Sequence, residues 1–232
     1  MKSKSITPTF PIWGNEITNR EAKQRVAAIV AAKARSGDVI GVGSGSTSYL
    51  TVLALGERIA NEGISIITIP TSSELAMACS AVGITVSSLL TMKPDWAFDG
   101  ADEVDPRQRL IKGRGGALLQ EKAVMAIATK TYIVVDDSKF VSSLGSKFAV
   151  PVETVPFCVH HVVEKLRDLG SHNIILRMAK GKDGPVITEG GNFLLDARFE
   201  NIEDSLEASI SAIVGVVESG LFINYPVEII RQ

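Results

Sequence analysis

The sequence contains only two cysteines and three histidines among its 232 residues. Cys79 and Cys158 lie far apart and form no C-x-x-C unit, so neither a disulfide framework nor a zinc knuckle is indicated. Two isolated thiols are typical of a reducing compartment, and we therefore expect a cytoplasmic protein. The histidines lack metal-ligand spacing and no convincing Ser/His/Asp order is present, so we assign no chemistry to His160, His161 and His172.

The sequence also lacks a strong charge imbalance and any long run of basic residues. Its formal net charge is -2, which does not provide the electrostatic footprint that a nucleic-acid surface needs. We expect no nucleic-acid partner, and any bound anion should be small. A signal peptide is not indicated, because residues 1–14 are polar, contain proline and have no apolar core.

Long hydrophobic runs are missing as well. One uncharged stretch, residues 75–92, has the length of a membrane span, but serines, threonines and Gly83 interrupt it. We interpret it as a helix that stops at Gly83 and is followed by a strand. We therefore expect no membrane partner.

What the sequence does have is the composition of a globular protein, with 45% hydrophobic and 22% charged residues. A capping box formed by Thr18 and Glu21 predicts the start of a first helix, which ends by Gly37. Predicted strands then alternate with predicted helices: strands over 38–43, 64–69, 84–88, 96–98 and 132–135, and helices over 47–61, 73–82 and 117–130. This alternation predicts a parallel sheet covered on both faces.

The pattern changes after about Gly145. We expect a smaller α+β unit built from strands over 148–153, 173–178 and 216–222, helices over 157–169 and 203–213, and short runs at 185–187 and 192–195. No internal repeat and no low-complexity linker separates the two parts, so they should pack closely.

A glycine- and serine-rich segment, residues 41–47, lies between a predicted strand and a predicted helix. Free backbone N–H groups and the helix dipole favour a phosphate there, and Ser44, Ser46 and Thr47 add hydroxyl donors. An ordinary capped turn is the simpler alternative. A dinucleotide site would need a third glycine at Ser46 and an acidic residue after the next strand, where residues 69–72 have none.

An acidic segment, residues 99–105, follows the strand that ends at Phe98. It places four carboxylates at the carboxyl edge of the sheet, where open α/β sheets bind ligands. Hydroxyl binding with proton transfer would explain them, and so would a Mg²⁺ site. A solvated acidic loop remains the third possibility.

A second glycine loop begins at Lys112 and leads into a helix that carries Glu121. Lys112 could neutralise an oxyanion, whereas Glu121 could simply complement the helix dipole. Lys139 adds a cation after a further strand, where a surface lysine beside a helix cap is the alternative.

Taken in order, these segments resemble the pattern of type A ribose-5-phosphate isomerases: a GxGSGST-like loop, DGADE, KG-x-G, a glutamate and then SK. The resemblance extends from Thr18 to Phe222 and includes Pro151-Val152-Glu153 and Gly220-Leu221-Phe222. It implies an α/β fold in which a Rossmann-like parallel-sheet domain carries the site beside a second, smaller α+β domain. The expected bounds are 1–144, completed by 223–232, and 145–222.

The resemblance also implies a role for each matching residue. The phosphate would be bound by Ser44, Gly45, Ser46 and Thr47, and the sugar hydroxyls would be bound by Asp99, Gly100, Ala101 and Asp102. The reacting oxygens would be bound by Lys112, Gly113, Arg114 and Gly115. Lys139 would contact the substrate, and Glu121 would transfer the proton. No metal and no organic cofactor is expected. One departure is Arg114, where the family usually has glycine, and it puts the choice of sugar in question.

The expected function is the interconversion of D-ribose 5-phosphate and D-ribulose 5-phosphate, in the non-oxidative pentose phosphate pathway, by a homo-oligomer (dimer or tetramer). Asp99 or Asp102 would assist ring opening, and Glu121 would move the C2 proton to C1 through a cis-enediolate that Lys112 stabilises. Arg114 motivates an alternative, an isomerase of a related pentose or tetrose phosphate. A non-catalytic sugar-phosphate-sensing domain is the other alternative, although Glu121 and Lys112 would be superfluous in it.

Overall fold

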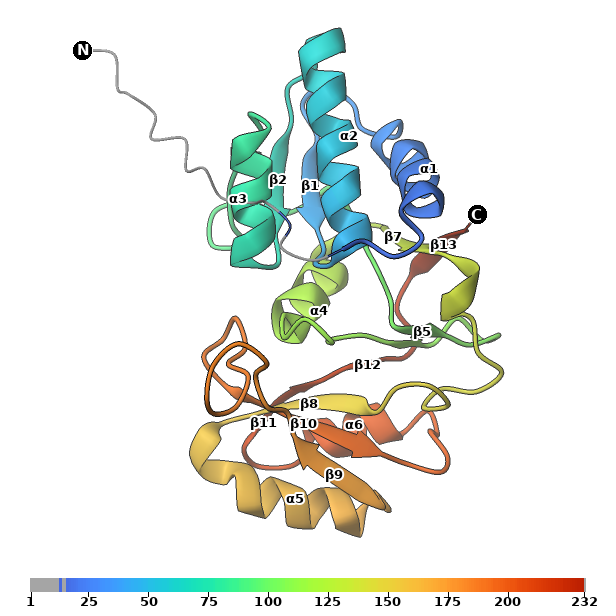
Figure 1. Ribbon diagram of the computed structural model, residues 1–232, viewed down its shortest axis with the longest axis vertical. Helices are drawn as coiled ribbons and strands as arrows, with labels where there is room; N and C mark the ends of the chain where they lie inside the picture. Colours follow the sequence, from blue (N-terminus) through green and yellow to red (C-terminus); the bar gives the residue numbers. More distant parts are fainter. Residues whose placement is uncertain (1–12, 14–15, 232) are drawn as a thin grey trace, which may run out of the picture.

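The computed structural model describes Trp13 and residues 16–231 (Figure 1). Its centre is a six-stranded sheet in the order β13-β7-β4-β1-β2-β3, in which every neighbouring pair is parallel. The strands are β1 (Val39–Val42), β2 (Ile67–Pro70), β3 (Thr85–Val86), β4 (Trp96–Asp99), β7 (Thr131–Val135) and β13 (Val227–Arg231). The predicted parallel sheet is therefore confirmed.

Helices cover both faces of this sheet. One face packs against α1 (Arg20–Ala31), α2 (Ser46–Glu62) and α3 (Ser73–Ala81) through a large apolar core, while α4 (Leu118–Ile127) covers the other face. Since side chains alternate along a strand, Phe98 lies in the α2 core, whereas Asp99 lies on the α4 side. This alternation places a carboxylate beneath α4 at the end of β4.

A smaller antiparallel sheet lies below the parallel one in Figure 1, in the order β11-β8-β10-β9. Its strands are β8 (Val150–Thr154), β9 (Asn173–Leu176), β10 (Phe193–Arg198) and β11 (Val216–Ser219), and α5 (Val159–Asp168) and α6 (Leu206–Ser211) pack on it. Single-turn helices η1 (Asp137–Lys139) and η2 (Pro156–Cys158) complete the described helical segments. The α/β class with a smaller α+β unit is thus confirmed.

A third sheet, β12-β6-β5, was not predicted. It joins β5 (Glu103–Val104), β6 (Leu110–Ile111) and β12 (Leu221–Phe222) in antiparallel pairs between the two larger sheets. The predicted single strand over 216–222 was wrong, because the chain leaves one sheet as β11 and enters another as β12. Gly220 makes the crossing possible: a Cβ there would lie 2.1 Å from the Lys112 carbonyl oxygen.

Some local predictions also need correction. The capping box was wrong: α1 begins at Arg20, its N-cap Asn19 has φ 52°, and no side chain caps it. The helix ends at Ala31, well before Gly37. The short run 185–187 forms only an isolated bridge between Met178 and Pro185.

The uncharged stretch 75–92 is a helix followed by a short strand, as interpreted, with α3 ending before Gly83 and β3 beginning at Thr85. Within residues 16–231, no helix combines the length and the apolar character needed to cross a membrane.

Candidate active site

The first part of the candidate site is the turn from β1 into α2. Gly43 must be glycine here, because a Cβ would lie 2.0 Å from Cγ of Asp99. Gly45 is the N-cap of α2 with φ 95°, a conformation that side chains rarely adopt, and Ser46 and Thr47 form the first turn. The first N–H groups of a helix have no partner within it, so this turn is suited to binding an anion.

Lys23 of α1 reaches the same turn. Its ammonium donates a hydrogen bond to Ser46 Oγ at 3.1 Å, although the residue is only 8% exposed. Burial lowers the pKa of Lys23, while Asp136 acts in the opposite direction. Lys23 was not among the residues predicted from the sequence. The available signal was its position on the apolar stripe of α1, three residues before the buried Val26.

The second part is a buried ionic cluster under α4, formed by Lys112, Asp99 and Glu121 (the Lys112 cluster). The Lys112 ammonium lies 2.8 Å from Asp99 Oδ2 and 3.2 Å from Glu121 Oε2, and all three side chains are at most 5% exposed. It also donates to the Gly100 carbonyl oxygen at 2.7 Å. Ser44 Oγ, from the β1–α2 turn, donates to Glu121 Oε1. The predicted phosphate turn and the predicted base are therefore in direct contact.

Two carboxylates share one ammonium in this cluster, and the pKa values reflect it. Burial, reinforced by the charge of Glu121, raises the pKa of Asp99 well above its ordinary value, although Lys112 acts against this. For Lys112, burial favours the neutral amine, but Asp99 and Glu121 outweigh it and raise the pKa. Among the described residues, Glu121 Oε2 has no hydrogen-bond donor of good geometry, despite its burial. A buried carboxylate oxygen that accepts no well-aligned hydrogen bond is suited to accepting a proton from a bound molecule.

Only half of the acidic segment belongs to this site. Asp102 Oδ2 accepts a hydrogen bond from the Arg114 N–H at 3.2 Å, and burial raises the pKa of Asp102 although Lys112 and Lys139 oppose it. The Glu103 carboxylate instead accepts hydrogen bonds from the backbone N–H groups of residues 145, 147 and 148, at 2.6–2.7 Å.

Asp105 also points elsewhere, because it forms an ion pair with Arg109 at 2.7 Å. Throughout the described part of the chain, no group of three or more His, Cys, Asp or Glu side chains is arranged to hold a metal ion. The idea that four carboxylates converge on one magnesium ion therefore has no support in the geometry.

Lys139 ends η1, and its charge acts on the pKa of both Asp102 and Lys23. It therefore belongs to the group of cations around the site. Gly113, with φ 100°, and Gly115 allow the loop after Lys112 to turn beside Ser44, since a Cβ on Gly115 would lie 3.5 Å from Ser44 Oγ.

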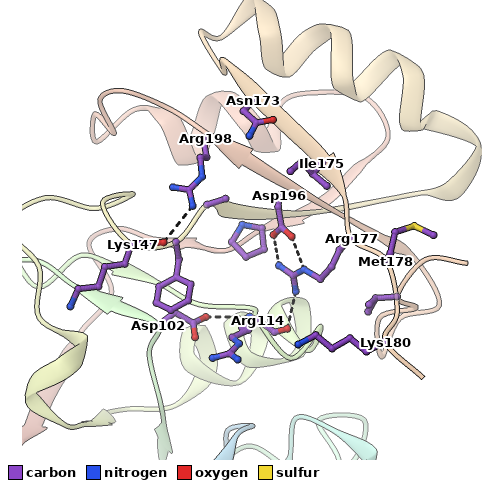
Figure 2. A pocket seen from close by; sticks show the side chains of 14 residues that line it. Asp102, Arg114, Lys147, Asn173, Ile175, Arg177, Met178, Lys180, Asp196 and Arg198 are labelled. Atoms are coloured by element: carbon purple, nitrogen blue, oxygen red, sulfur yellow. Dashed lines mark hydrogen bonds and ion pairs between the residues drawn. The ribbon is translucent and has the colours of Figure 1, made fainter. Parts of the chain in front are cut away.

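Arg114 is exposed and lines a cavity of about 550 Å³ between the loop and the smaller sheet (Figure 2). Asp102 lies on the same wall, and Arg177 and Asp196 extend from the sheet opposite. Arg177 donates to the carbonyl oxygens of Gly113 and Arg114, at 3.2 and 2.8 Å, while Asp196 holds its guanidinium. The smaller sheet thus fixes the backbone of the loop and leaves the Arg114 side chain beside open space.

Comparisons with known proteins indicate one family. A family model described as ribose 5-phosphate isomerase A (phosphoriboisomerase A) matches residues 67–231. The ribose-5-phosphate isomerase A of Thermosynechococcus vestitus is 46% identical over 209 residues, covering 88% of each chain, and that of Methanoregula boonei is 46% identical over 205 residues, covering 87% of this chain and 85% of its own.

Solved structures are similar over nearly the full length. Ribose 5-phosphate isomerase A from Methanocaldococcus jannaschii superposes with a TM-score of 0.88 at 39% identity, covering 91% of this chain and 95% of its own. A D-ribose-5-phosphate isomerase in complex with phospho-erythronic acid gives a TM-score of 0.87 at 37% identity, covering 92% and 95%. The fold, the order of its motifs and these similarities lead to one conclusion: the chain belongs to the ribose 5-phosphate isomerase A family.

Proposed function

We propose that this protein is an aldose-ketose isomerase that interconverts D-ribose 5-phosphate and D-ribulose 5-phosphate in the non-oxidative pentose phosphate pathway. The observation that carries the proposal is the Lys112 cluster. A buried carboxylate oxygen of Glu121 lies 3.2 Å from the Lys112 ammonium and accepts no well-aligned hydrogen bond from the described residues. This pairing supplies a base and an oxyanion stabiliser at one place, as an enediolate reaction requires.

The phosphate group binds at the start of α2. Ser44, Gly45, Ser46 and Thr47 supply N–H and hydroxyl donors, and Lys23, whose ammonium already contacts Ser46 Oγ at 3.1 Å, adds a positive charge. Lys139 contributes a second cation from η1. Binding the phosphate at this turn directs the sugar towards Glu121, because Ser44 contacts that carboxylate.

The reaction then moves one proton between two carbons. Asp99 or Asp102 assists opening of the furanose ring; the raised pKa of each carboxyl favours the protonated form that can donate to the ring oxygen. Glu121 removes the proton from C2 and returns it to C1, while a proton passes from O2 to O1. The ammonium of Lys112 stabilises the negative oxygen of the cis-enediolate.

The remaining predicted residues hold the sugar. Gly100 and Ala101 form the backbone between the two aspartates, and the Gly100 carbonyl orients Lys112 through a bond of 2.7 Å. Gly113, Arg114 and Gly115 contact the sugar oxygens, from a loop that Arg177 fixes. No metal or organic cofactor takes part.

An assay of ribose 5-phosphate turnover after exhaustive chelation with EDTA tests the proposal. We expect full activity. Activity lost on chelation and restored by Mg²⁺ or Mn²⁺ would contradict the metal-free mechanism. Turnover only of another pentose or tetrose phosphate would favour the related isomerase, and binding without turnover would favour the sensing domain.

We further propose that residues 1–144 and 223–232 form the domain that carries the site, and that 145–222 form the smaller domain. The parallel pairing of β13 with β7 supports this division. We also propose a cytoplasmic homo-oligomer, a dimer or tetramer. The free thiols of Cys79 and Cys158 support the compartment, and the exposed Phe157 supports an association surface. Light scattering of the purified protein tests the association, and a monomer would contradict it.

A further inference from the structure

We propose that Lys122, Glu207 and Glu218 form a positioning cluster. This cluster holds the Glu121 carboxylate and the Lys112 ammonium in the relative positions that proton transfer requires. We call these three residues the Lys122 cluster. The inference rests on the proposed function, because it assigns Glu121 as the base and Lys112 as the group that stabilises the enediolate.

The Lys122 cluster joins α4 to the smaller sheet. The Lys122 ammonium lies 2.6 Å from Glu207 Oε1 on α6 and 2.8 Å from Glu218 Oε1 on β11, and the three side chains are only 7%, 15% and 18% exposed. Backbone groups orient the carboxylates: the Ile223 N–H donates to Glu207 Oε2 at 2.8 Å, and the Ser219 N–H donates to Glu218 Oε1 at 2.7 Å. The ammonium therefore binds two carboxylates whose positions are already fixed.

Lys122 directly follows Glu121 in α4. Consecutive residues of an α-helix point about 100° apart around its axis, so one turn presents its two side chains to different neighbours. Glu121 contacts Lys112 and Ser44, whereas Lys122 contacts α6 and β11. A rotation or sliding of α4 that moves the Glu121 carboxylate therefore also moves the backbone of Lys122 relative to its two carboxylates.

The segment from Glu218 to Phe222 links this cluster to Lys112. Its alternate residues make the three contacts, as expected for an extended chain. Glu218 binds Lys122, the Gly220 carbonyl accepts the Lys112 N–H at 2.9 Å, and the Phe222 ring lies 4.8 Å from the Lys122 ammonium and 5.5 Å from that of Lys112. One short segment thus fixes both the backbone of Lys112 and the helix that carries Glu121.

An ionic cluster suits this place because its hydrogen bonds have a preferred distance and direction. A buried ammonium between two carboxylates costs desolvation free energy, and apolar side chains of similar volume often give equal or greater stability. Apolar contacts have little directional preference, whereas a hydrogen bond weakens as its distance and angle depart from their preferred values. Reacting groups need positions accurate to about 0.5 Å, which directional contacts supply.

The test compares Lys122→Met with Lys122→Arg. A displacement of about 1 Å can cost about 100-fold in rate, so Lys122→Met should lower kcat by about 10- to 100-fold. KM should change by less than about threefold, because the phosphate turn is untouched. The primary isotope effect with 2-deuterated ribose 5-phosphate should rise, because C–H cleavage becomes slower. Lys122→Arg, which keeps the charge, should recover most of kcat.

Leu166→Ala provides a matched control for lost stability. Leu166 is buried in α5 within the core of the smaller sheet, so its truncation destabilises the fold without touching either cluster. All variants are measured at a temperature at which each is fully folded. Leu166→Ala should keep the wild-type kcat and isotope effect, and a change equal to that of Lys122→Met would reduce Lys122 to a purely structural role.

A folded Lys122→Met protein with unchanged kcat and isotope effect would also overturn the proposal. If Lys122→Met does not fold, the same measurements are made on Glu218→Gln, which keeps the side-chain shape. A lower kcat with a larger isotope effect supports the proposed role of the cluster. Wild-type values overturn that role. A wild-type protein without ribose 5-phosphate turnover would refute the proposed function and this inference together. Equal turnover by wild type and variants would refute this inference alone.

Discussion

The Lys112 cluster and the Lys122 cluster have the same composition, one lysine and two carboxylates, and both ammonium groups lie near the Phe222 ring. They differ in what remains unsatisfied. In the Lys122 cluster, backbone N–H groups also bind both carboxylates, and three elements are joined. In the Lys112 cluster, one oxygen of Glu121 accepts no well-aligned hydrogen bond from the described residues, although the Lys112 ammonium lies 3.2 Å away. Similar charged groups thus differ in how far backbone hydrogen bonds fix their carboxylates.

Their surroundings differ as well. The Lys112 cluster contacts the start of α2 through Ser44, and Lys112 leads into the glycine loop that lines the cavity. The Lys122 cluster lies between α4, α6 and β11, and Tyr225 lies beside it. Burial and the charges of Glu207 and Glu218 raise the pKa of Tyr225, so this hydroxyl stays protonated. Four variants test whether this contrast between the two clusters is correct.

The largest effect should follow Glu121→Gln, which keeps the shape of the side chain but removes the proton acceptor. General-base catalysis contributes about 10²–10⁴-fold, so kcat should fall by at least that order, while the affinity for inorganic phosphate barely changes. Glu218→Gln is the matched change in the Lys122 cluster, and it should lower kcat far less.

If Glu121→Gln kept more than about a tenth of the wild-type kcat, less than the loss expected for a general base, the contrast would fail. Asp102 would then become the candidate base. Glu103 would not, because three backbone N–H groups already occupy its carboxylate.

A smaller effect should follow Lys23→Met, because Lys23 contacts Ser46 at the start of α2 and belongs to neither cluster. A charged hydrogen bond contributes about 1.5–3 kcal/mol, so KM for ribose 5-phosphate and the inhibition constant of phosphate should both rise about 10- to 100-fold. Lys33→Met, just beyond the end of the same helix, changes an ammonium that lies over Tyr132 and should leave both constants unchanged. Equal constants for wild type and Lys23→Met would remove Lys23 from the phosphate site.

Arg114→Gly should act on substrate choice rather than on the chemical step. Arg114 borders both the site and the cavity, so its removal should change the ratio of kcat/KM between ribose 5-phosphate and a tetrose phosphate by about tenfold or less. Lys180→Ala changes a cavity lysine outside the glycine loop and should leave the ratio unchanged. A constant ratio in Arg114→Gly would mean that the side chain does not contact the sugar.

The smallest effect concerns stability and pH. The folded-state pKa of Asp99 is raised, so its stabilising contribution is complete below the unfolded pKa of about 3.9 and is lost as pH rises through the folded value. The free energy of unfolding should therefore fall as pH rises between the two pKa values. The free energy of unfolding, measured with urea at pH 5 and pH 8, should differ less between the two pH values in Asp99→Asn than in the wild type. Parallel profiles would show that Asp99 ionises normally.

Much of the fold followed from local patterns. The helix predicted over 73–82 is α3 (Ser73–Ala81), and the strand predicted over 132–135 is β7 (Thr131–Val135). These elements have clear periodicity, and their ends have ordinary capping or turn residues. The two-residue strands β5 and β6 were missed, because so short a segment shows no periodicity and depends on pairing with β12.

The division of 216–222 into two strands was also invisible in the sequence. A continuous apolar run is compatible with a single strand, and only the close approach of the Lys112 backbone to Gly220 shows where the chain changes sheets. Lys23 was missed for the same reason, since its contact with Ser46 depends on how α1 packs on α2.

By itself, the sequence determined the alternation of elements, the phosphate turn, the acidic segment and the glycine loop, because residues close in the chain set periodicity, turns and helix starts. Only the tertiary structure decided which charged groups meet. It brought Asp99, Lys112 and Glu121 together, directed Glu103 and Asp105 elsewhere and gave Lys122 its own pair of carboxylates. Such contacts join residues far apart in the chain, so they depend on the packing of whole elements and on which acceptors the backbone leaves unsatisfied.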